Sequence, residues 1–145
     1  MNFLILNGPN LNLLGRREPE IYGHQTLDEV IGNLQESFSE HSLEHLQTNH
    51  EGVIIDKLQE VGFSYDGIIL NPGGYTHTSI AIRDAISGIT TPVVEVHISD
   101  IYQREAFRQH SYLTEVCVHH IVGKGVEGYA LAVGWLVQNL TPNQS

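Results

Sequence analysis

Short runs of apolar residues recur along the chain, and each run ends in a polar or glycine-rich segment. Runs of this kind are typical of strands that are buried on both faces of a parallel sheet. We expect four such strands, at Met1–Asn7, Asp66–Leu70, Pro92–Val96 and Val116–Val122. A fifth candidate, Leu43–Asn49, is more polar, as an edge strand would be.

Between these strands, apolar residues return every three or four positions, which is the period of an amphipathic helix. Helices are expected at Leu27–Phe38, Val53–Val61, Thr76–Ile86 and Val126–Leu140. Thr26 and Glu29 form a capping-box pattern at the start of the first helix. Alternating strands and helices predict an α/β fold, and five strands fit a flavodoxin-like, doubly wound parallel sheet of order 2-1-3-4-5.

The size and composition of the chain agree with one globular domain. We expect its 145 residues to form a single domain, 1–145, with a frayed tail at 141–145. With 41% apolar and 17% charged residues, the chain resembles soluble proteins. No run approaches the roughly 20 apolar residues of a membrane helix, and the N-terminus lacks a signal-peptide pattern, so we expect a cytoplasmic protein without a membrane partner.

The charge balance excludes one class of partner. Seven Lys and Arg residues against seventeen Asp and Glu residues give a formal net charge of −10. This is the wrong sign for a protein that binds by neutralising phosphates, so no nucleic-acid partner is expected. Four of the five arginines nevertheless lie in two short segments, Arg16–Arg17 and Arg104–Arg108. Such clusters of a scarce residue type call for a specific role.

Polar segments at the carboxyl ends of the strands form the candidate site, because ligands of doubly wound sheets bind there. Three of these segments, Asn7–Asn10, Asn71–His77 and Glu95–Ser99, are rich in functional side chains. Turn formation explains their Asn, Gly and Pro residues but not their histidines.

The connection Leu11–Gly23 between the first strand and the first helix is much longer than the usual length of about 2–6 residues. It contains two arginines and Tyr22, has few apolar anchors, and has Gly15 and Gly23 as candidate hinges. These features predict that the connection is a lid that closes over a binding site. A surface Ω-loop with solvated charges is the alternative interpretation.

Three other patterns suggest different chemistry. Gly123–Gly128 matches the G-x-G-x-x-G dinucleotide fingerprint, but no strand and no ribose-binding acid follow it, which favours a tight strand-to-helix turn. His41–His45 matches the zinc-protease pattern H-x-x-E-H, yet it straddles a predicted helix end and strand start, which favours a polar connection. His119 and His120 are adjacent in a strand, so they point to opposite faces and cannot chelate one ion. Cys117 is a lone cysteine and is expected in the core. We therefore expect no metal.

Five segments in order contain distinctive motifs. They are N-G-P-N-L-N-L-L-G-x-R-E-P-x-x-Y-G from Asn7, N-P-G-G-Y-T-H-T-S from Asn71, V-E-V-H-I-S from Val94, R-E-x-F-R from Arg104 and G-x-G-x-x-G-Y from Gly123. Together they resemble the type II 3-dehydroquinate dehydratases over nearly the whole chain. The sequence departs from the family pattern in two places. Many members have a histidine where this chain has Gln109, and small or apolar residues where it has His119 and His120.

The resemblance implies a flavodoxin-like subunit, assembled as trimers into a dodecamer, that converts 3-dehydroquinate to 3-dehydroshikimate without a metal or organic cofactor. It implies that Tyr22 is the base and His97 the acid, and that Arg17 is a lid arginine supporting the transition state. Asn10 would stabilise an enolate through water, and Glu95 would orient the acid. The implied substrate-binding residues are Asn71, His77, Ile98, Ser99, Arg108 and, from a neighbouring subunit, Asp84.

The proposed reaction needs these residue types. Removing water from a β-hydroxy ketone requires a base for the carbon-bound proton, a stabiliser for the enolate and an acid for the departing hydroxyl. Tyrosine is a poor base unless it is ionised, and one cation about 4 Å away stabilises a phenolate by roughly 4 kcal/mol at an effective dielectric constant of 20. We therefore expect Arg17 and Arg108 to flank Tyr22. His77 and Thr78 are expected to open a helix whose N-terminus adds positive potential.

Two other hypotheses belong to different classes. A flavodoxin-like module that binds a nucleotide or flavin would use Gly123–Gly128, but no phosphate-binding loop follows the first strand. A catalytically inactive scaffold is the third hypothesis, and the presence of Tyr22, Arg17, His97 and Arg108 argues against it. The sequence does not distinguish a biosynthetic role from quinate degradation.

Overall fold

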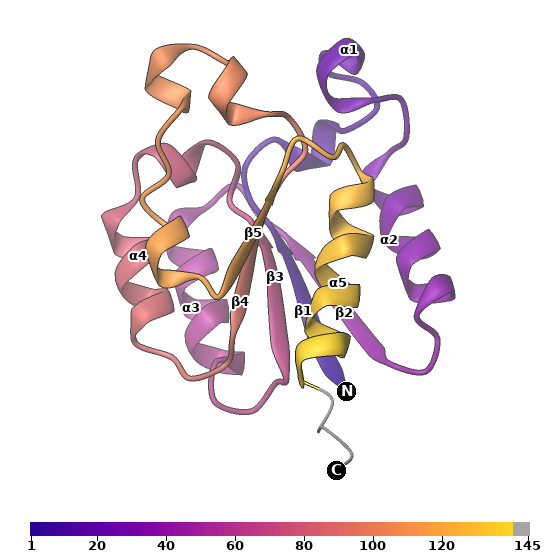
Figure 1. The fold of residues 1–145 in the computed structure, drawn as a ribbon, viewed down its shortest axis with the longest axis vertical. Helices are drawn as coiled ribbons and strands as arrows, with labels where there is room; N and C mark the ends of the chain where they lie inside the picture. The colour runs from indigo at the N-terminus through magenta and orange to yellow at the C-terminus, as the bar shows by residue number, and fades with distance from the viewer. Residues whose placement is uncertain (141–145) are drawn as a thin grey trace.

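A five-stranded parallel sheet runs through the centre of the molecule and has helices on both faces (Figure 1). The computed structural model describes residues 1–140, and the tail predicted to be frayed lies outside the described residues. The sheet order is β2-β1-β3-β4-β5, which confirms the predicted order. The strands are β1 (Asn2–Asn7), β2 (Ser42–Gln47), β3 (Gly67–Asn71), β4 (Val93–His97) and β5 (His119–Val122).

The helices divide between the two faces of the sheet. Helices α2 (Leu27–Ser37) and α5 (Glu127–Leu140) cover one face, and α3 (Glu51–Val61) and α4 (Ile80–Ser87) cover the other. A short helix, α1 (Pro19–Tyr22), lies within the long connection after β1. No helix within residues 1–140 is long and apolar enough to cross a membrane.

Strand β1 shows why its sequence is a continuous apolar run. Phe3 and Ile5 pack in the core beneath α2 and α5, whereas Leu4 and Leu6 pack in the core beneath α3 and α4. A strand at the centre of such a sheet is buried on both sides, so alternation of apolar and polar residues disappears. Burying each of these side chains contributes roughly 1.5–3 kcal/mol.

The N-cap predicted at Thr26 for the first long helix is confirmed. The Thr26 hydroxyl accepts a hydrogen bond of 3.3 Å from the backbone N–H of Glu29 and donates to the Glu29 carboxylate at 3.1 Å. The first of these bonds satisfies a backbone donor that the first turn of α2 would otherwise leave unpaired.

The predicted helix Thr76–Ile86 is wrong at its N-terminus. Residues Gly73–His77 form a 3₁₀ turn, and α4 begins only at Ile80, where the Ser79 hydroxyl caps it by accepting from the N–H of Ile82 at 2.9 Å. His77 and Thr78 therefore do not open α4. The capping serine, which prefers to end a non-helical segment, determines where this helix starts.

The last predicted strand is shorter than expected. Thr114–Val116 forms a 3₁₀ turn, and β5 begins at His119. Leu113, Val116 and Cys117 instead pack into or against the core beneath α3 and α4. This burial explains why the segment before His119 is apolar although it is not a strand. The expectation that Cys117 is a core residue agrees with this packing.

Candidate active site

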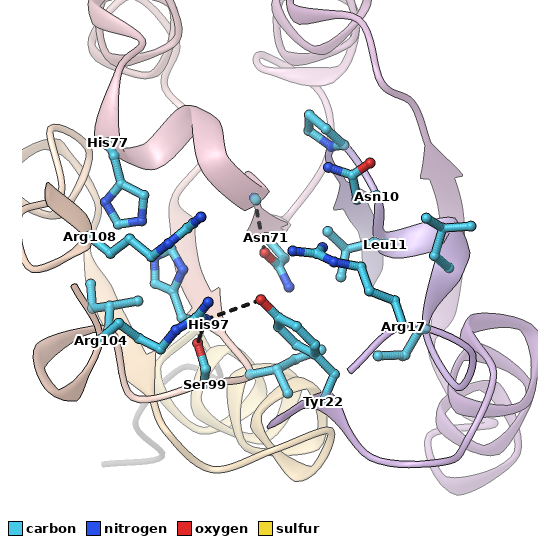
Figure 2. Close-up of a pocket in the computed structure, with 16 residues that line it drawn as sticks. Asn10, Leu11, Arg17, Tyr22, Asn71, His77, His97, Ser99, Arg104 and Arg108 are labelled. Carbon is cyan, nitrogen blue, oxygen red and sulfur yellow. Dashed lines mark hydrogen bonds between the residues drawn. The ribbon is translucent and has the colours of Figure 1, made fainter. Parts of the chain in front are cut away.

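A pocket lies where the carboxyl ends of β1, β3 and β4 meet two long connections (Figure 2). One connection joins β1 to α2 and contains α1, and the other joins β4 to β5. Nine of the predicted site residues line the pocket: Asn10, Arg17, Tyr22, Asn71, His77, His97, Ile98, Ser99 and Arg108. Glu95 lies beneath it in contact with His97, and Asp84 of α4 is not among its lining residues.

A close backbone approach joins the ends of β1 and β3 at the base of the pocket. The N–H of Gly8 donates to the carbonyl of Asn71 at 2.8 Å. A Cβ atom at Gly8 would lie only 2.6 Å from the carbonyl oxygen of Pro72, so only glycine fits at this point. The contact holds the loop of Asn10 next to that of Asn71.

Two guanidinium groups flank Tyr22, which ends helix α1. Arg104 Nη1 donates a hydrogen bond of 3.1 Å to the Tyr22 hydroxyl and another of 3.2 Å to the Ser99 hydroxyl. The Arg17 guanidinium carbon lies 5.1 Å from the centre of the Tyr22 ring. The hydrogen bond to Tyr22 raises the pKa of Arg104, so this cation stays charged. Tyr22 therefore lies between two guanidinium groups that come from different connections.

The sequence predicted Arg108 as the second cation beside Tyr22, and this prediction is wrong. The second cation is Arg104. Arg108 Nε lies 2.8 Å from the Glu105 carboxylate, and its guanidinium packs over the Phe107 ring at 5.0 Å. Arg104 and Arg108 belong to the same irregular connection, so no helical or strand period indicates which of them turns toward Tyr22. Sequence reasoning assigned no role to Arg104.

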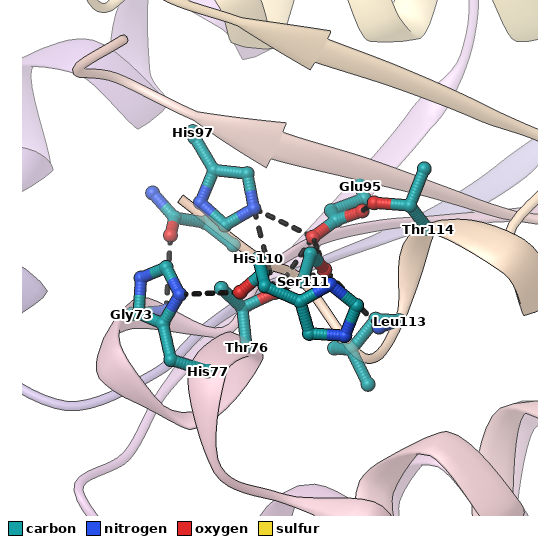
Figure 3. A network of polar contacts seen from close by, with 10 residues as sticks. Gly73, Thr76, His77, Glu95, His97, His110, Ser111, Leu113 and Thr114 are labelled. Atoms are coloured by element: carbon teal, nitrogen blue, oxygen red, sulfur yellow. Dashed lines mark hydrogen bonds and ion pairs between the residues drawn. The ribbon is translucent and has the colours of Figure 1, made fainter. Parts of the chain in front are cut away.

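A buried carboxylate holds His97 (Figure 3). Glu95 is fully buried, and its Oε2 lies 2.6 Å from His97 Nε2. Three hydroxyl groups also donate to this carboxylate at 2.6 Å, those of Thr76 and Ser111 to Oε2 and that of Thr114 to Oε1. Neither carboxylate oxygen is left without a partner.

The network keeps Glu95 ionised. Burial alone would raise the pKa of this carboxyl, but the hydrogen bond and charge of His97, with the hydroxyls of Ser111 and Thr114, lower it to about 2. An ionised Glu95 can only accept, so His97 Nε2 holds a proton. Nδ1 is then the ring nitrogen of His97 that remains for a ligand in the pocket.

His77 lies beside His97 on the pocket wall, with the ring centres 6.5 Å apart. Its Nδ1 donates to the carbonyl of His110 at 2.8 Å, which leaves Nε2 for a ligand. Burial lowers the pKa of His77, and the nearby His97 and Arg108 lower it further. A neutral His77 therefore offers Nε2 to a ligand as a hydrogen-bond acceptor.

The comparisons with known proteins identify the family. The family model described as Dehydroquinase class II matches residues 1–137. The chain belongs to the class II dehydroquinase family.

Curated relatives and solved structures cover nearly all of this class II dehydroquinase. The 3-dehydroquinate dehydratase of Bacillus pumilus is 52% identical over 139 residues, which span 94% of each chain. The catabolic 3-dehydroquinase of Penicillium rubens is 51% identical over 91% of this chain and 86% of its own. The crystal structure of the type II dehydroquinase from Butyrivibrio crossotus aligns with a TM-score of 0.91 at 45% identity, over 94% of this chain and 97% of that one.

The glycine motif of this class II dehydroquinase forms the tight turn between β5 and α5, as predicted. The N–H groups of Gly123 and Gly125 donate to the carbonyls of His97 and Ile98 at 3.1 and 3.0 Å. The motif therefore supports the end of β4, where the pocket residues lie.

The departures from the family pattern lie in two places. Gln109 Nε2 donates to the backbone carbonyl of Arg104 at 3.0 Å, so this departure contacts the segment that supplies Arg104. His119 stacks on Trp135 with ring centres 4.7 Å apart, on the outer face of β5 and α5. The first departure is next to the site, and the second is remote from the pocket lining.

The H-x-x-E-H segment is not the polar connection that we expected. Most of it belongs to β2, where His45 Nε2 lies 3.0 Å from the Asn7 amide nitrogen. His41 instead lies 3.1 Å from the amino group of Met1. The two histidines thus have separate partners.

Proposed function

We propose that this chain is a 3-dehydroquinate dehydratase, a hydro-lyase that removes water from 3-dehydroquinate to give 3-dehydroshikimate. The observation that carries the proposal is the pairing of Tyr22 with Arg104 and of His97 with Glu95 on one pocket. Relatives named for this activity are about half identical to the chain over nearly its full length. Some of these relatives are named catabolic 3-dehydroquinases, and others are named simply 3-dehydroquinate dehydratases. The same dehydration serves quinate degradation and biosynthesis.

The reaction begins with Tyr22 as the base. Its phenolate takes the proton from the carbon next to the substrate ketone, and the electron pair of that C–H bond forms an enolate. Arg104 and Arg17, which lie beside the ring, stabilise the negative oxygen before the transfer. Arg17 then supports the transition state, and Asn10 stabilises the enolate through a water molecule.

His97 completes the elimination as the acid. The enolate electrons re-form the ketone and the carbon–carbon double bond, and the C–O bond to the hydroxyl breaks. The departing oxygen takes the proton from His97 Nδ1 and leaves as water. Glu95 stabilises the imidazolium before this step, because its carboxylate accepts from Nε2. Solvent exchange then returns Tyr22 and His97 to their starting protonation states.

The remaining pocket residues bind the substrate. Arg108 supplies a positive charge for the carboxylate, and the main chain at Ile98 and Ser99 supplies donors at the end of β4. His77 and Asn71 hydrogen-bond substrate oxygens. No residue in this scheme needs a metal or an organic cofactor.

We further propose a cytoplasmic dodecamer built from trimers, in which Asp84 completes the pocket of a neighbouring subunit. The absence of Asp84 from the pocket lining of its own chain supports this arrangement. Sizing in solution tests it, because a monomer of 16.2 kDa and a dodecamer elute far apart.

An absorbance assay tests the activity directly. Purified protein mixed with 3-dehydroquinate should produce the rising absorbance of a conjugated enone. Tyr22→Phe should abolish turnover while the substrate still binds, whereas Tyr102→Phe, on an exposed ring outside the pocket, should leave turnover unchanged. A folded wild-type protein that gives no absorbance rise would refute the dehydratase function.

A further inference from the structure

A line of hydrogen bonds connects the pocket to the edge strand β2 through the protein interior. The backbone N–H of Gly73 donates to Asn71 Oδ1 at 3.1 Å, and Asn71 Nδ2 donates to the Tyr129 hydroxyl at 2.9 Å. The Tyr129 hydroxyl donates to Asn7 Oδ1 at 2.5 Å, and Asn7 Nδ2 lies 3.0 Å from His45 Nε2. The line joins β3, α5, β1 and β2.

The direction of every bond in the line follows from its first donor. A backbone N–H can only donate, so Asn71 must turn its oxygen toward Gly73 and its NH₂ group toward Tyr129. Tyr129 has one hydroxyl proton, and it gives that proton to the oxygen of Asn7. The NH₂ group of Asn7 then faces His45.

The same logic determines the state of His45. Because the NH₂ group of Asn7 is a donor, His45 Nε2 must be a bare acceptor, and the ring proton must reside on Nδ1. A protonated His45 would bring two N–H groups against each other. Reversing the Asn7 amide would not relieve this conflict, because the Tyr129 hydroxyl would lose its acceptor.

We propose that Tyr129 and His45 are positioning residues that, together with the N–H of Gly73, hold the Asn71 amide in one orientation toward the substrate. This inference rests on the proposed function, in which Asn71 binds a substrate oxygen. Beyond its two bonds in the line, the Asn71 amide has one further N–H and one further lone pair. Asn71 lines the pocket next to Tyr22, so this N–H and lone pair can bind the substrate (Figure 2). A rotated amide would exchange a donor for an acceptor at the substrate.

Burial makes the line act as a unit. Tyr129 and Asn7 are fully buried and Asn71 is almost so, and an unpaired polar group in such surroundings is costly. Burial also raises the pKa of Tyr129, which keeps its phenol protonated and able to donate.

His45 is the half-buried end of the line, beside a cavity that two charged side chains also line. These are Asp28 from α2 and Arg16 from the connection after β1. Burial lowers the pKa of His45, against the opposing effect of Asp28. A neutral imidazole is what the line requires.

Nitrogen-15 NMR of the imidazole rings tests the line without any substrate. The His45 signal, identified by its loss in His45→Gln, should be that of the Nδ1–H tautomer at neutral pH. A protonated Nε2 on His45 would overturn the proposal. This result does not depend on whether the protein is a dehydratase.

A double-mutant cycle tests the link to the substrate. Tyr129→Phe keeps the ring and removes the hydroxyl, and it should lower kcat/KM by about tenfold, the effect of one hydrogen bond. Asn71→Ala should lower kcat/KM further, and adding Tyr129→Phe to that variant should cause no further loss. Effects that multiply, or an unchanged kcat/KM in Tyr129→Phe, would mean that the hydroxyl only stabilises the fold.

His45, the half-buried end of the line, offers a second comparison if Tyr129→Phe does not fold. His45→Gln retains an acceptor for Asn7 and should keep kcat/KM, whereas His45→Leu removes the acceptor and should lower it. Equal activity in these two variants would overturn the role of His45. An inactive wild-type enzyme would instead refute the dehydratase function and leave the tautomer measurement to decide the line.

Discussion

Arg104 donates a hydrogen bond of 3.1 Å to the hydroxyl of Tyr22, although the two residues lie 82 positions apart in the sequence. Tyr22 belongs to the connection after β1, and Arg104 belongs to the connection after β4. Parallel strands end at the same edge of the sheet, which brings these two connections together. The cation and the phenol therefore meet only in the folded chain.

Arg104→Gln should lower kcat for 3-dehydroquinate by roughly 10²–10³-fold, the usual cost of one charge-stabilising donor in an active site. Without this cation the Tyr22 hydroxyl loses its hydrogen-bond donor in the pocket, and steady-state kinetics measures the loss. Arg16→Gln is the matched control, because Arg16 is exposed on the same connection as Tyr22 and lies outside the pocket. A kcat in Arg104→Gln equal to that of wild type would limit Arg104 to holding the loops together.

Glu95 should make the free energy of unfolding depend on pH in acid. Its folded-state pKa of about 2 lies below the reference value of 4.5, so the ionised carboxylate stabilises the fold fully above about pH 4.5. This stabilisation is lost as the pH falls toward 2. Urea unfolding of wild type and Glu95→Gln should give a stability difference that narrows by roughly 1.4 kcal/mol per pH unit below 4.5. A difference that stays constant between pH 7 and this acid range would contradict the low pKa.

Gly8→Ala should destabilise the protein by about 1–3 kcal/mol, because the new methyl group would meet the backbone carbonyl of Pro72 at 2.6 Å. Gly32→Ala is the matched control without a clash. Gly32 lies in α2, and no atom lies within 4 Å of the added Cβ. This change should raise stability by roughly 0.5–1 kcal/mol. Thermal melts of both variants test the pair, and similar melting temperatures would show that the close approach at Gly8 relaxes.

Thr26→Ala should cost about 1 kcal/mol of stability, because it removes the acceptor for the Glu29 N–H at the start of α2. Thr26→Ser keeps the hydroxyl and should recover most of the loss. Activity should change little in either variant, since Thr26 lies outside the pocket lining. Equal melting temperatures for the alanine and serine variants would rule out capping as the source of stability.

The strands and their order follow from the sequence because buried parallel strands leave a simple trace, a short apolar run before a polar stop. Helix α1 has no such trace, since four residues from Pro19 to Tyr22 are too few to display a helical period. The apolar residues before His119 misled the prediction for the opposite reason. They are buried by α3 and α4, and burial produces the same residue types whether or not the backbone is extended.

The candidate site divides in the same way. Residues at strand ends, such as Asn71 and His97, could be predicted because the fold class itself places them at the binding edge. The choice between Arg104 and Arg108 depends on the path of an irregular connection, which no local pattern specifies. Tyr129 appeared only as one letter of a motif, because its partners Asn7 and Asn71 are distant in sequence and meet it through packing alone.

Helix α5 is the last described element to leave the ribosome, and it covers a sheet face whose strands β1 and β3 are made much earlier. Phe3, Ile5 and Ile69 pack in one core with Val133 and Leu136 of this helix. During synthesis Phe3, Ile5 and Ile69 lack part of their final covering until α5 has been translated. Incomplete chains of this protein should therefore be prone to self-association and should be preferred clients of chaperones that bind apolar surfaces.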